Sequence, residues 1–289
     1  MISAAGQCTL LGAPLDSSGS GRGEKNAPGA LRAAGLVDAL GVWDAGDADT
    51  ILTDPTRDPV TGLIGFSGLV RASQALRSTL RGPLSLGARP LVIGGDCTIL
   101  LGILAAMRDH DDSRIGLWFL DGHADFYDGS TSSTGEGADM ELAIATGHGP
   151  AGLVDLAQPP LVVAREVVLL GHRRAEDDPD TANELGFLPT SLFHLDATTI
   201  TEIGAARVGQ EVEHRLASAV ERAWLHLDLD VARHREALAE REVPDLEARP
   251  AELPARAVPA ASLRRGREDG GVEPAHDARV REIESLRLG

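Results

Sequence analysis

The chain has 289 residues and a formal net charge of −17; 43% of its residues are hydrophobic and only 3% are aromatic. Its length suits one large domain with a sizeable core, and its strong negative charge argues against nucleic acid and anionic membranes as partners. Two cysteines provide no disulfide framework, and we find neither a signal peptide nor an apolar run that could span a bilayer, so we expect a cytoplasmic protein.

Short apolar runs alternate along the chain with longer Ala- and Leu-rich stretches of helical spacing. The short runs predict strands at residues 9–12, 90–93, 115–120, 166–170, 192–195 and 223–229. The longer stretches predict helices at residues 27–40, 68–80, 98–108 and 208–223. This alternation indicates a single α/β domain with a doubly wound, largely parallel sheet that is flanked by helices.

The alternating pattern ends after Val231. Residues 232–289 contain no aromatic side chain and are rich in Arg, Glu, Ala and Pro. We therefore divide the chain into an α/β domain, residues 1–231, and an anomalous C-terminal segment, residues 232–289. We expect that segment to be a disordered tail or the product of a shifted reading frame.

Three potential metal ligands follow the predicted strand 115–120. They are Asp121, His123 and Asp125, at alternate positions. Where the chain is still extended just beyond a strand, alternate side chains point the same way, so all three could face one point. Two carboxylates and an imidazole suit Mn²⁺, with Zn²⁺ or Fe²⁺ as alternatives. A polar loop that satisfies its own hydrogen bonds is the other interpretation.

The strand predicted at residues 223–229 alternates strictly, with three leucines on one face and polar residues on the other. The polar face carries His226, Asp228 and Asp230. Two aspartates that point inward at a strand end are costly without a cation, so we predict that both are metal ligands. A solvated strand face is the competing interpretation. We expect His226 to be a packed or hydrogen-bonded histidine rather than a ligand.

A third polar segment, Gly94-Gly95-Asp96-Cys97-Thr98, follows the predicted strand 90–93. Its two glycines permit a tight turn. Cys97 is either a soft metal ligand or a small buried hydrophobe, and for a lone cysteine the second is the safer interpretation. Because the carboxyl ends of parallel strands meet at one edge of a sheet, the three polar segments together predict one shared site.

In this order, the three segments resemble the signatures of the ureohydrolase family of arginase, agmatinase and formimidoylglutamase. Gly94-Gly95-Asp96-Cys97-Thr98 is similar to the family's GGDH[ST] motif. Asp121-Gly-His123-Ala-Asp125 is similar to its DxHxD motif, and Asp228-Leu-Asp230 to its DxD motif. The resemblance implies an arginase-like three-layer sandwich. It also implies a pair of Mn²⁺ ions and a bridging hydroxide that attacks the carbon of a guanidinium or related group, so that a linear C–N bond is hydrolysed.

By position, the resemblance assigns six metal ligands. One ion would take Cys97, Asp121, Asp125 and Asp228, and the other would take Asp121, His123, Asp228 and Asp230. The implied substrate is a small guanidino, amidino or formimino compound, and the implied assembly is a homo-oligomer. Cys97 stands where the family has a histidine, and a thiolate favours Zn²⁺ over Mn²⁺.

Two further departures concern catalysis. Ala138 stands near the position of a catalytic histidine in many ureohydrolases, and His148 is the only later candidate for a proton shuttle in that stretch. The Asp-Pro and Gly-Gly segments that follow the family's DxD motif are not recognisable after Val231. Three interpretations therefore remain: a hydrolase of linear C–N bonds, a catalytically impaired homologue that keeps a metal-binding scaffold, and a deacylase with a single metal.

Overall fold

A computed structural model describes residues 8–110 and 114–232, so the predictions for residues 233–289 lie outside the described part. The strands are β1 (Cys8–Ala13), β2 (Trp43–Asp47), β3 (Arg89–Gly94), β4 (Ile115–Leu120), β5 (Val167–His172), β6 (Phe193–Asp196) and β7 (Arg222–Leu227). The helices are α1 (Ala27–Ala33), α2 (Leu36–Leu40), α3 (Phe66–Ser85), α4 (Ile99–His110), α5 (Glu141–Ala145), α6 (Pro179–Leu185), α7 (Ala197–Ile203) and α8 (Ala205–Ala219).

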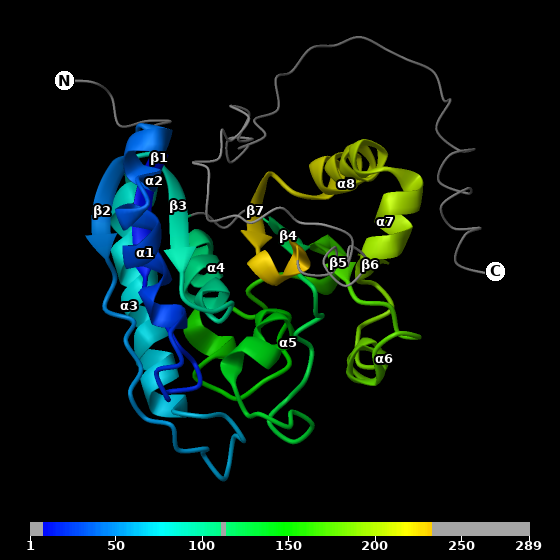
Figure 1. The fold of residues 1–289 in the computed structure, drawn as a ribbon, viewed down its shortest axis with the longest axis horizontal. Helices are drawn as coiled ribbons and strands as arrows, with labels where there is room; N and C mark the ends of the chain where they lie inside the picture. Colours follow the sequence, from blue (N-terminus) through cyan, green and yellow to red (C-terminus); the bar gives the residue numbers. More distant parts are fainter. Residues whose placement is uncertain (1–7, 111–113, 233–289) are drawn as a thin grey trace, which may run out of the picture.

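The strands form two parallel sheets with the orders β2-β1-β3 and β6-β5-β4-β7. The predicted parallel α/β fold is thus confirmed, although its strands are hydrogen-bonded as two sheets among the described residues. Figure 1 shows β1–β3 with α1–α4 on one side of the molecule and β4–β7 with α6–α8 on the other. Strands β3 and β7 each lie at an edge of their sheet.

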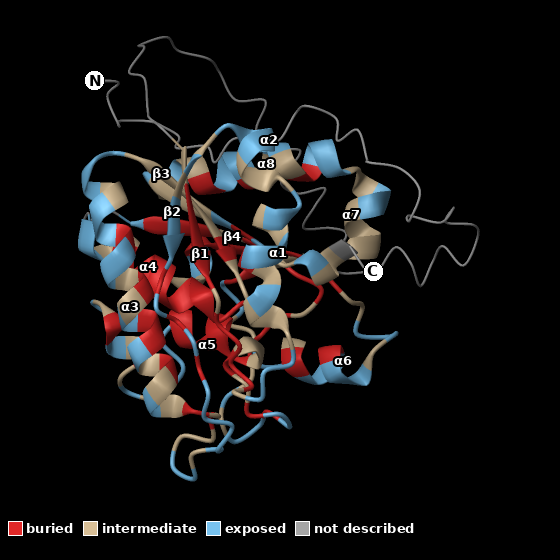
Figure 2. Ribbon diagram, turned by 60° about the vertical axis from the view of Figure 1, so that its left-hand side comes forward, coloured by how far each residue is buried: buried red, intermediate tan, exposed pale blue. Residues whose placement is uncertain are grey.

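Helices cover both faces of the second sheet, as alternate residues of β5 show. Val167 and Leu169 belong to the main core, which also contains the buried side of α3 and nearly all of α4. Val168 and Leu170 point to the other face and pack in a smaller core under α8. Figure 2 shows the buried residues concentrated in β1, β4, α4 and α5. No helix in the described ranges is both long and apolar enough to cross a bilayer.

The helix predicted at residues 27–40 is interrupted. It forms α1 and α2, separated at Gly35, whose φ of 87° lies in the left-handed region. The sequence pattern also missed α6 and α7, which are only seven residues long. Each has an aspartate cap that was a usable signal: Asp178 accepts from the Asp180 N–H, and Asp196 accepts from the Thr199 N–H.

Two helices of the main core, α3 and α4, approach each other closely at a glycine. Gly102 in α4 lies against α3, where an added Cβ would stand 2.8 Å from the Ser73 carbonyl oxygen and 3.0 Å from the Leu76 Cβ. Real Cβ atoms do not tolerate the shorter distance to a backbone atom, so the absence of a side chain at Gly102 sets the spacing of α3 and α4.

We expect Gly102→Ala to lower the free energy of unfolding by about 1–3 kcal/mol, because the methyl group overpacks this helix contact. The matched control is Gly209→Ala in α8, where an added Cβ has nothing within 4 Å. This control should gain about 0.5–1 kcal/mol from the better helix propensity of alanine. Urea unfolding measures both changes, and a gain in the Gly102 variant like that of the control would contradict the close approach.

Candidate metal centre

Polar side chains from three strand ends meet at one place in the structure. Strands β4 and β7 are neighbours, with Leu120 paired to Leu227, so the residues that follow them emerge together. The Asp228 N–H donates to the Leu120 carbonyl oxygen at 2.9 Å and extends this pairing past the end of β7. Cys97, which follows β3, lies with its Sγ 2.6 Å from Asp228 Oδ2. The sequence prediction of a shared location for these three segments agrees with this geometry.

Four side chains form a group that we call the buried cluster. Its members are Cys97, Asp121, Asp125 and Glu141, all buried, and each offers a ligand atom within 4.8 Å of the others. The Cys97 Sγ lies 3.7 Å from Asp121 Oδ2. Sequence analysis predicted the first three members but missed Glu141, which opens the short helix α5.

A second group, the outer cluster, shares Asp121 with the first. Its members are Asp121, His123 and Asp230. The His123 Nδ1 lies 2.9 Å from Asp230 Oδ2 and 3.6 Å from Asp121 Oδ1. The guanidinium of Arg173 contacts His123 Nε2 and lies 3.7 Å from Asp230 Oδ2. The outer cluster therefore includes nitrogen and positive charge, which the members of the buried cluster lack.

The DxHxD segment does not direct its three side chains at one point. The chain leaves the extended conformation after β4, and Asp125 adopts a φ of 48°, unusual for a residue other than glycine. Asp125 consequently joins the buried cluster, His123 joins the outer cluster, and Asp121 belongs to both. Glu184 holds this conformation, because its carboxylate accepts from the N–H groups of Ala124 and Phe126 at 3.0 and 2.9 Å.

The pKa values of both clusters are shifted by burial and by neighbouring charges. Burial raises the pKa of Asp125 well above its ordinary value, and the charge of Asp121 adds to the rise. Burial also raises the pKa of the Cys97 thiol well above its ordinary value. At His123, burial acts to lower the pKa, but hydrogen bonds with Asp121 and Asp230 outweigh it and raise the pKa to about 10.

These residues fit a divalent cation. Several carboxyl groups and a thiol are buried together, and they hold protons where a cation is absent. Metal binding displaces such protons and offsets the cost of burying negative charge. The donor atoms are mostly oxygen with one sulfur in the buried cluster, and oxygen with one imidazole nitrogen in the outer cluster, a set that accommodates Mn²⁺, Fe²⁺ or Zn²⁺.

Strand β7 buries its polar face and exposes its apolar one. His226 is buried, and its ring stacks on Phe119 with centroids 4.9 Å apart and planes inclined by 8°. Leu225 and Leu227 on the other face are 46% and 55% exposed. The alternative of a solvated polar face is therefore wrong for His226. Its packing against Phe119 agrees with the predicted packed histidine, although its ring also lies within ligand range of Cys97 and Asp121.

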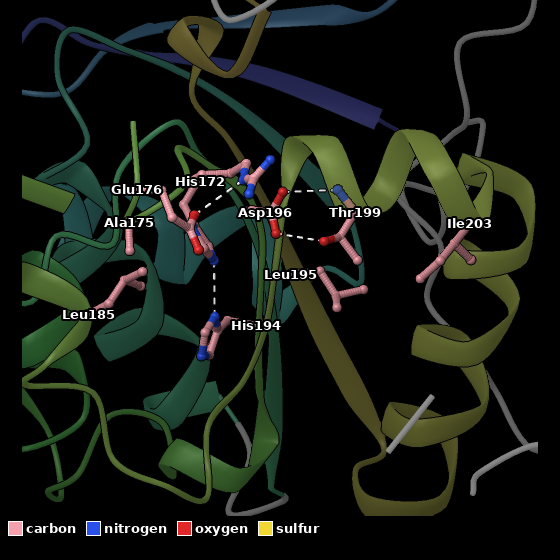
Figure 3. A pocket seen from close by; sticks show the side chains of 10 residues that line it. His172, Ala175, Glu176, Leu185, His194, Leu195, Asp196, Thr199 and Ile203 are labelled. Carbon is pink, nitrogen blue, oxygen red and sulfur yellow. Dashed lines mark hydrogen bonds and ion pairs between the residues drawn. The ribbon is translucent and has the colours of Figure 1, made fainter. Parts of the chain in front are cut away.

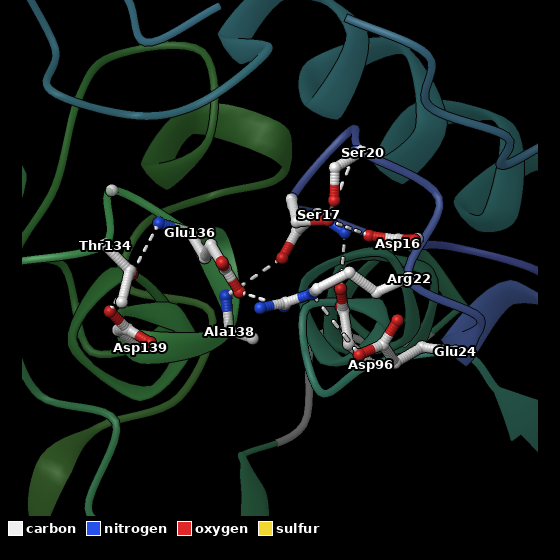
Figure 4. A network of polar contacts seen from close by, with 12 residues as sticks. Asp16, Ser17, Ser20, Arg22, Glu24, Asp96, Thr134, Glu136, Ala138 and Asp139 are labelled. Atoms are coloured by element: carbon white, nitrogen blue, oxygen red, sulfur yellow. Dashed lines mark hydrogen bonds and ion pairs between the residues drawn. The ribbon is translucent and has the colours of Figure 1, made fainter. Parts of the chain in front are cut away.

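The region where ureohydrolases carry a catalytic histidine is occupied differently here (Figure 4). The Ala138 N–H donates to the Ser17 Oγ at 3.3 Å, and the Ser17 N–H donates to Asp96 Oδ2 at 2.5 Å. An ion pair between Arg22 and Glu136 lies beside them. This network fixes the loop before α5, so Ala138 serves as a backbone anchor.

His148, the candidate proton shuttle, is exposed. Its Nδ1 lies 3.3 Å from the Thr146 Oγ1 in the same loop, and its ring centroid lies 5.6 Å from that of Phe126 in the segment that follows β4. His148 belongs to neither cluster. Its role as a shuttle stays a prediction that requires the loop to move.

A separate hollow opens beside β5 and β6 (Figure 3). At its floor His172 donates from Nδ1 to the Arg173 carbonyl oxygen at 2.7 Å, and its Nε2 lies 3.0 Å from the His194 Nδ1. Burial lowers the pKa of His172. Glu176 and Asp196 line the rim. None of the members of the two clusters lines this hollow, so it is distinct from the candidate metal centre.

His226 should make the stability of the metal-free protein depend on pH. Burial lowers its pKa to about 4, whereas an unfolded histidine titrates near about 6.5. The unfolded chain thus binds the extra proton between these values, so the stabilisation is complete above about pH 6.5 and is lost as the pH falls toward 4.

The wild type should lose roughly 3 kcal/mol of its free energy of unfolding over that interval because of His226. His226→Asn lacks the titrating ring, so its free energy of unfolding should fall by that much less. Urea unfolding at a series of pH values, in the presence of a chelator, measures both profiles. Parallel profiles for the two proteins would show that burial does not suppress protonation of His226.

Comparisons with known proteins agree with the fold and with the motifs. A family model described as "Arginase family" matches residues 6–237. A curated relative, the arginase of Brevibacillus brevis, is 28% identical over 229 residues, which cover 77% of this chain and 74% of that protein.

Two solved structures are also similar. The crystal structure of the Bacillus cereus arginase has 28% sequence identity and a TM-score of 0.65, and the match covers 78% of this chain and 75% of that one. The native structure of the Bacillus caldovelox arginase has 26% identity and a TM-score of 0.66, covering 78% and 76%. Since the family model spans most of the chain, this protein belongs to the arginase family of hydrolases.

Proposed function

We propose that this protein is a metal-dependent hydrolase that cleaves linear, non-peptide C–N bonds in small guanidino, amidino or formimino compounds. Its place in the arginase family supports the reaction class. The observation that carries the metal dependence is the position of Asp121 in both clusters, since one buried carboxylate shared by two groups of ligands is suited to bridge two ions.

The proposed ligand sets follow the two clusters. The first ion would be held by three members of the buried cluster, Cys97, Asp121 and Asp125, together with Asp228, whose Oδ2 lies 2.6 Å from the Cys97 Sγ. The second would be held by the outer cluster, again with Asp228. Mn²⁺ is the cation that the family resemblance implies, and the Cys97 thiolate shifts the preference of the first position toward Zn²⁺ or Fe²⁺.

When bound, the pair of cations would lower the pKa of a water molecule, so that hydroxide is available as the nucleophile at neutral pH. The chain's own residues prepare the site for this. Glu184 fixes the loop that carries the ligands through two backbone N–H groups. Arg173 contacts the Nε2 atom of the His123 ring, whereas Asp230 contacts its Nδ1 atom. Such outer partners tune metal affinity through the orientation of the ligands.

Charge also favours the proposed class of substrate. The chain carries a formal net charge of −17, and the candidate site is itself acidic. A cationic guanidinium or amidinium is attracted to such a surface, whereas a phosphorylated or nucleic acid substrate is repelled. As part of the same proposal, residues 1–231 form the catalytic domain and the protein assembles as a homo-oligomer, which light scattering on the purified chain tests.

A panel of substrates tests the proposal. Arginine, agmatine, guanidinobutyrate, formimidoylglutamate and acetylated amines are each incubated with the Mn²⁺-loaded and the chelator-treated protein, and urea, ammonia and acetate are measured. We expect urea or ammonia from a guanidino or formimino compound, with metal required. Acetate release with a single bound metal would instead indicate a deacylase. Stable metal binding without turnover would indicate a catalytically impaired scaffold.

The bridging role predicts that Asp121→Asn loses both metals rather than one. The neutral amide cannot supply a bridging carboxylate, so we expect bound metal, measured by elemental analysis after dialysis, to fall below one equivalent. Activity should fall by more than about 100-fold, beyond the loss typical of an outer-shell change. The control Asp155→Asn changes an exposed aspartate in the same way and should keep the wild-type metal content. Retention of one full equivalent in Asp121→Asn would contradict bridging.

A further inference from the structure

Glu141 is a buried acid that belongs to neither of the ligand sets implied by the family motifs. It is the first residue of α5, a helix of five residues that are all buried, and its own exposed fraction is 0%. Neither of its carboxylate oxygens has a hydrogen-bond partner among the described residues. A polar side chain that is fully buried without a partner is rare, and such a group calls for a physical explanation.

The surroundings of Glu141 contain acids and a thiol but no positive charge. Its ligand atom lies within 4.8 Å of those of Cys97, Asp121 and Asp125. Arg173, which lies beside the centre, contacts His123 and Asp230 of the outer cluster instead. Other buried glutamates of this protein are satisfied, since Glu184 accepts two backbone N–H groups. The position of Glu141 is therefore unfavourable unless a cation joins the buried cluster.

We propose that Glu141 is a further ligand of the metal ion in the buried cluster, so that it joins Cys97, Asp121, Asp125 and Asp228 around one divalent cation. This rests on the proposed metal dependence, but it adds a carboxylate that the family motifs do not assign. The carboxylate of Glu141 then adds an oxygen ligand to a centre in which Cys97 stands where the family has a histidine.

Two other roles for Glu141 fit the structure less well. A substrate-binding glutamate must be reached from solvent, whereas Glu141 has no exposed surface. A structural glutamate needs donors, but the groups that approach its carboxylate are the Asp125 carboxyl group and its own backbone N–H, and neither makes a hydrogen bond of normal geometry. His226 is the competing extra ligand, because its Nε2 also lacks a hydrogen-bond partner. However, its ring is stacked on Phe119, and its group with Cys97 and Asp121 has one member fewer.

Metal affinity of the full-length chain tests the proposal without reference to turnover. Wild type, Glu141→Gln and the control Glu166→Gln are freed of metal with a chelator and titrated with Mn²⁺ and with Zn²⁺ in equilibrium dialysis. Glu166 is a matched control, since it is equally buried but pairs with Arg114 outside both clusters. We expect Glu141→Gln to weaken one of the two sites by at least about 100-fold, and the control to retain both affinities.

Thermal unfolding gives an independent readout. In the metal-free state Glu141→Gln should melt at or above the temperature of the wild type, because a neutral amide replaces the unpartnered carboxyl group. Its rise in Tm on addition of metal should be smaller than that of the wild type. Glu141→Asp, which keeps the charge but shortens the side chain, serves if the glutamine variant does not fold, and it should weaken the same site.

Four results would overturn the proposal: no metal bound by the wild type, equal affinities in Glu141→Gln and wild type, a loss no larger than that of Glu166→Gln, or loss of the site in His226→Asn alone. These results are separable from a failure of the proposed reaction. If the wild type hydrolyses no compound of the panel but Glu141→Gln still loses one metal site, the proposed reaction fails and the role of Glu141 as a ligand stands. If the wild type turns over a substrate but Glu141→Gln binds both metals as tightly as the wild type, the proposed reaction stands and the role of Glu141 as a ligand fails.

Discussion

The dominant physical constraint in this protein is the burial of negative charge where three strand ends meet. Asp121, Asp125 and Glu141 are buried together with the Cys97 thiol, and no positively charged residue belongs to their group. Hydrophobic packing of α4 and β4 holds these groups in place, but it cannot compensate their desolvation. The proposed divalent cation would compensate this buried charge, and the convergence of the four side chains is consistent with a cation site.

The scaffold meets this constraint by fixing the ligands from behind. Glu184 in α6 binds two backbone N–H groups of the loop after β4, so the unusual backbone at Asp125 is held from outside the clusters. On the other side, the Gly122 N–H donates to Asp230 Oδ1 at 2.9 Å. Hydrogen bonds from outside the clusters thus position the candidate ligands Asp125 and Asp230, an arrangement that would give a metal site rigidity.

Much of this architecture could be predicted from sequence because it depends on local patterns. The predicted strand 115–120 has the bounds of β4, and the polar segments at the ends of β3, β4 and β7 do lie together. What could not be predicted depends on packing between distant segments. Nothing in the sequence around Glu141 shows that α5 is buried on all sides. The division of Asp121, His123 and Asp125 between two clusters accompanies the left-handed backbone of Asp125. The exposure of Leu225 and Leu227 depends on which other segments cover that face of the sheet.

The pairing of β4 with β7 has a kinetic consequence. It joins segments that are far apart in the sequence: the contact between Cys97 and Asp228 spans 131 positions, and the one between Gly122 and Asp230 spans 108. Contacts of such high order form late, since the entropy of closing a long loop is lost before the contact contributes. No chain in which β7 is still undocked can present both aspartates of the DxD motif to the residues after β4. The proposed cation could therefore be held by both aspartates only after β7 has docked, and a nascent chain that ends before residue 230 would lack the complete candidate centre.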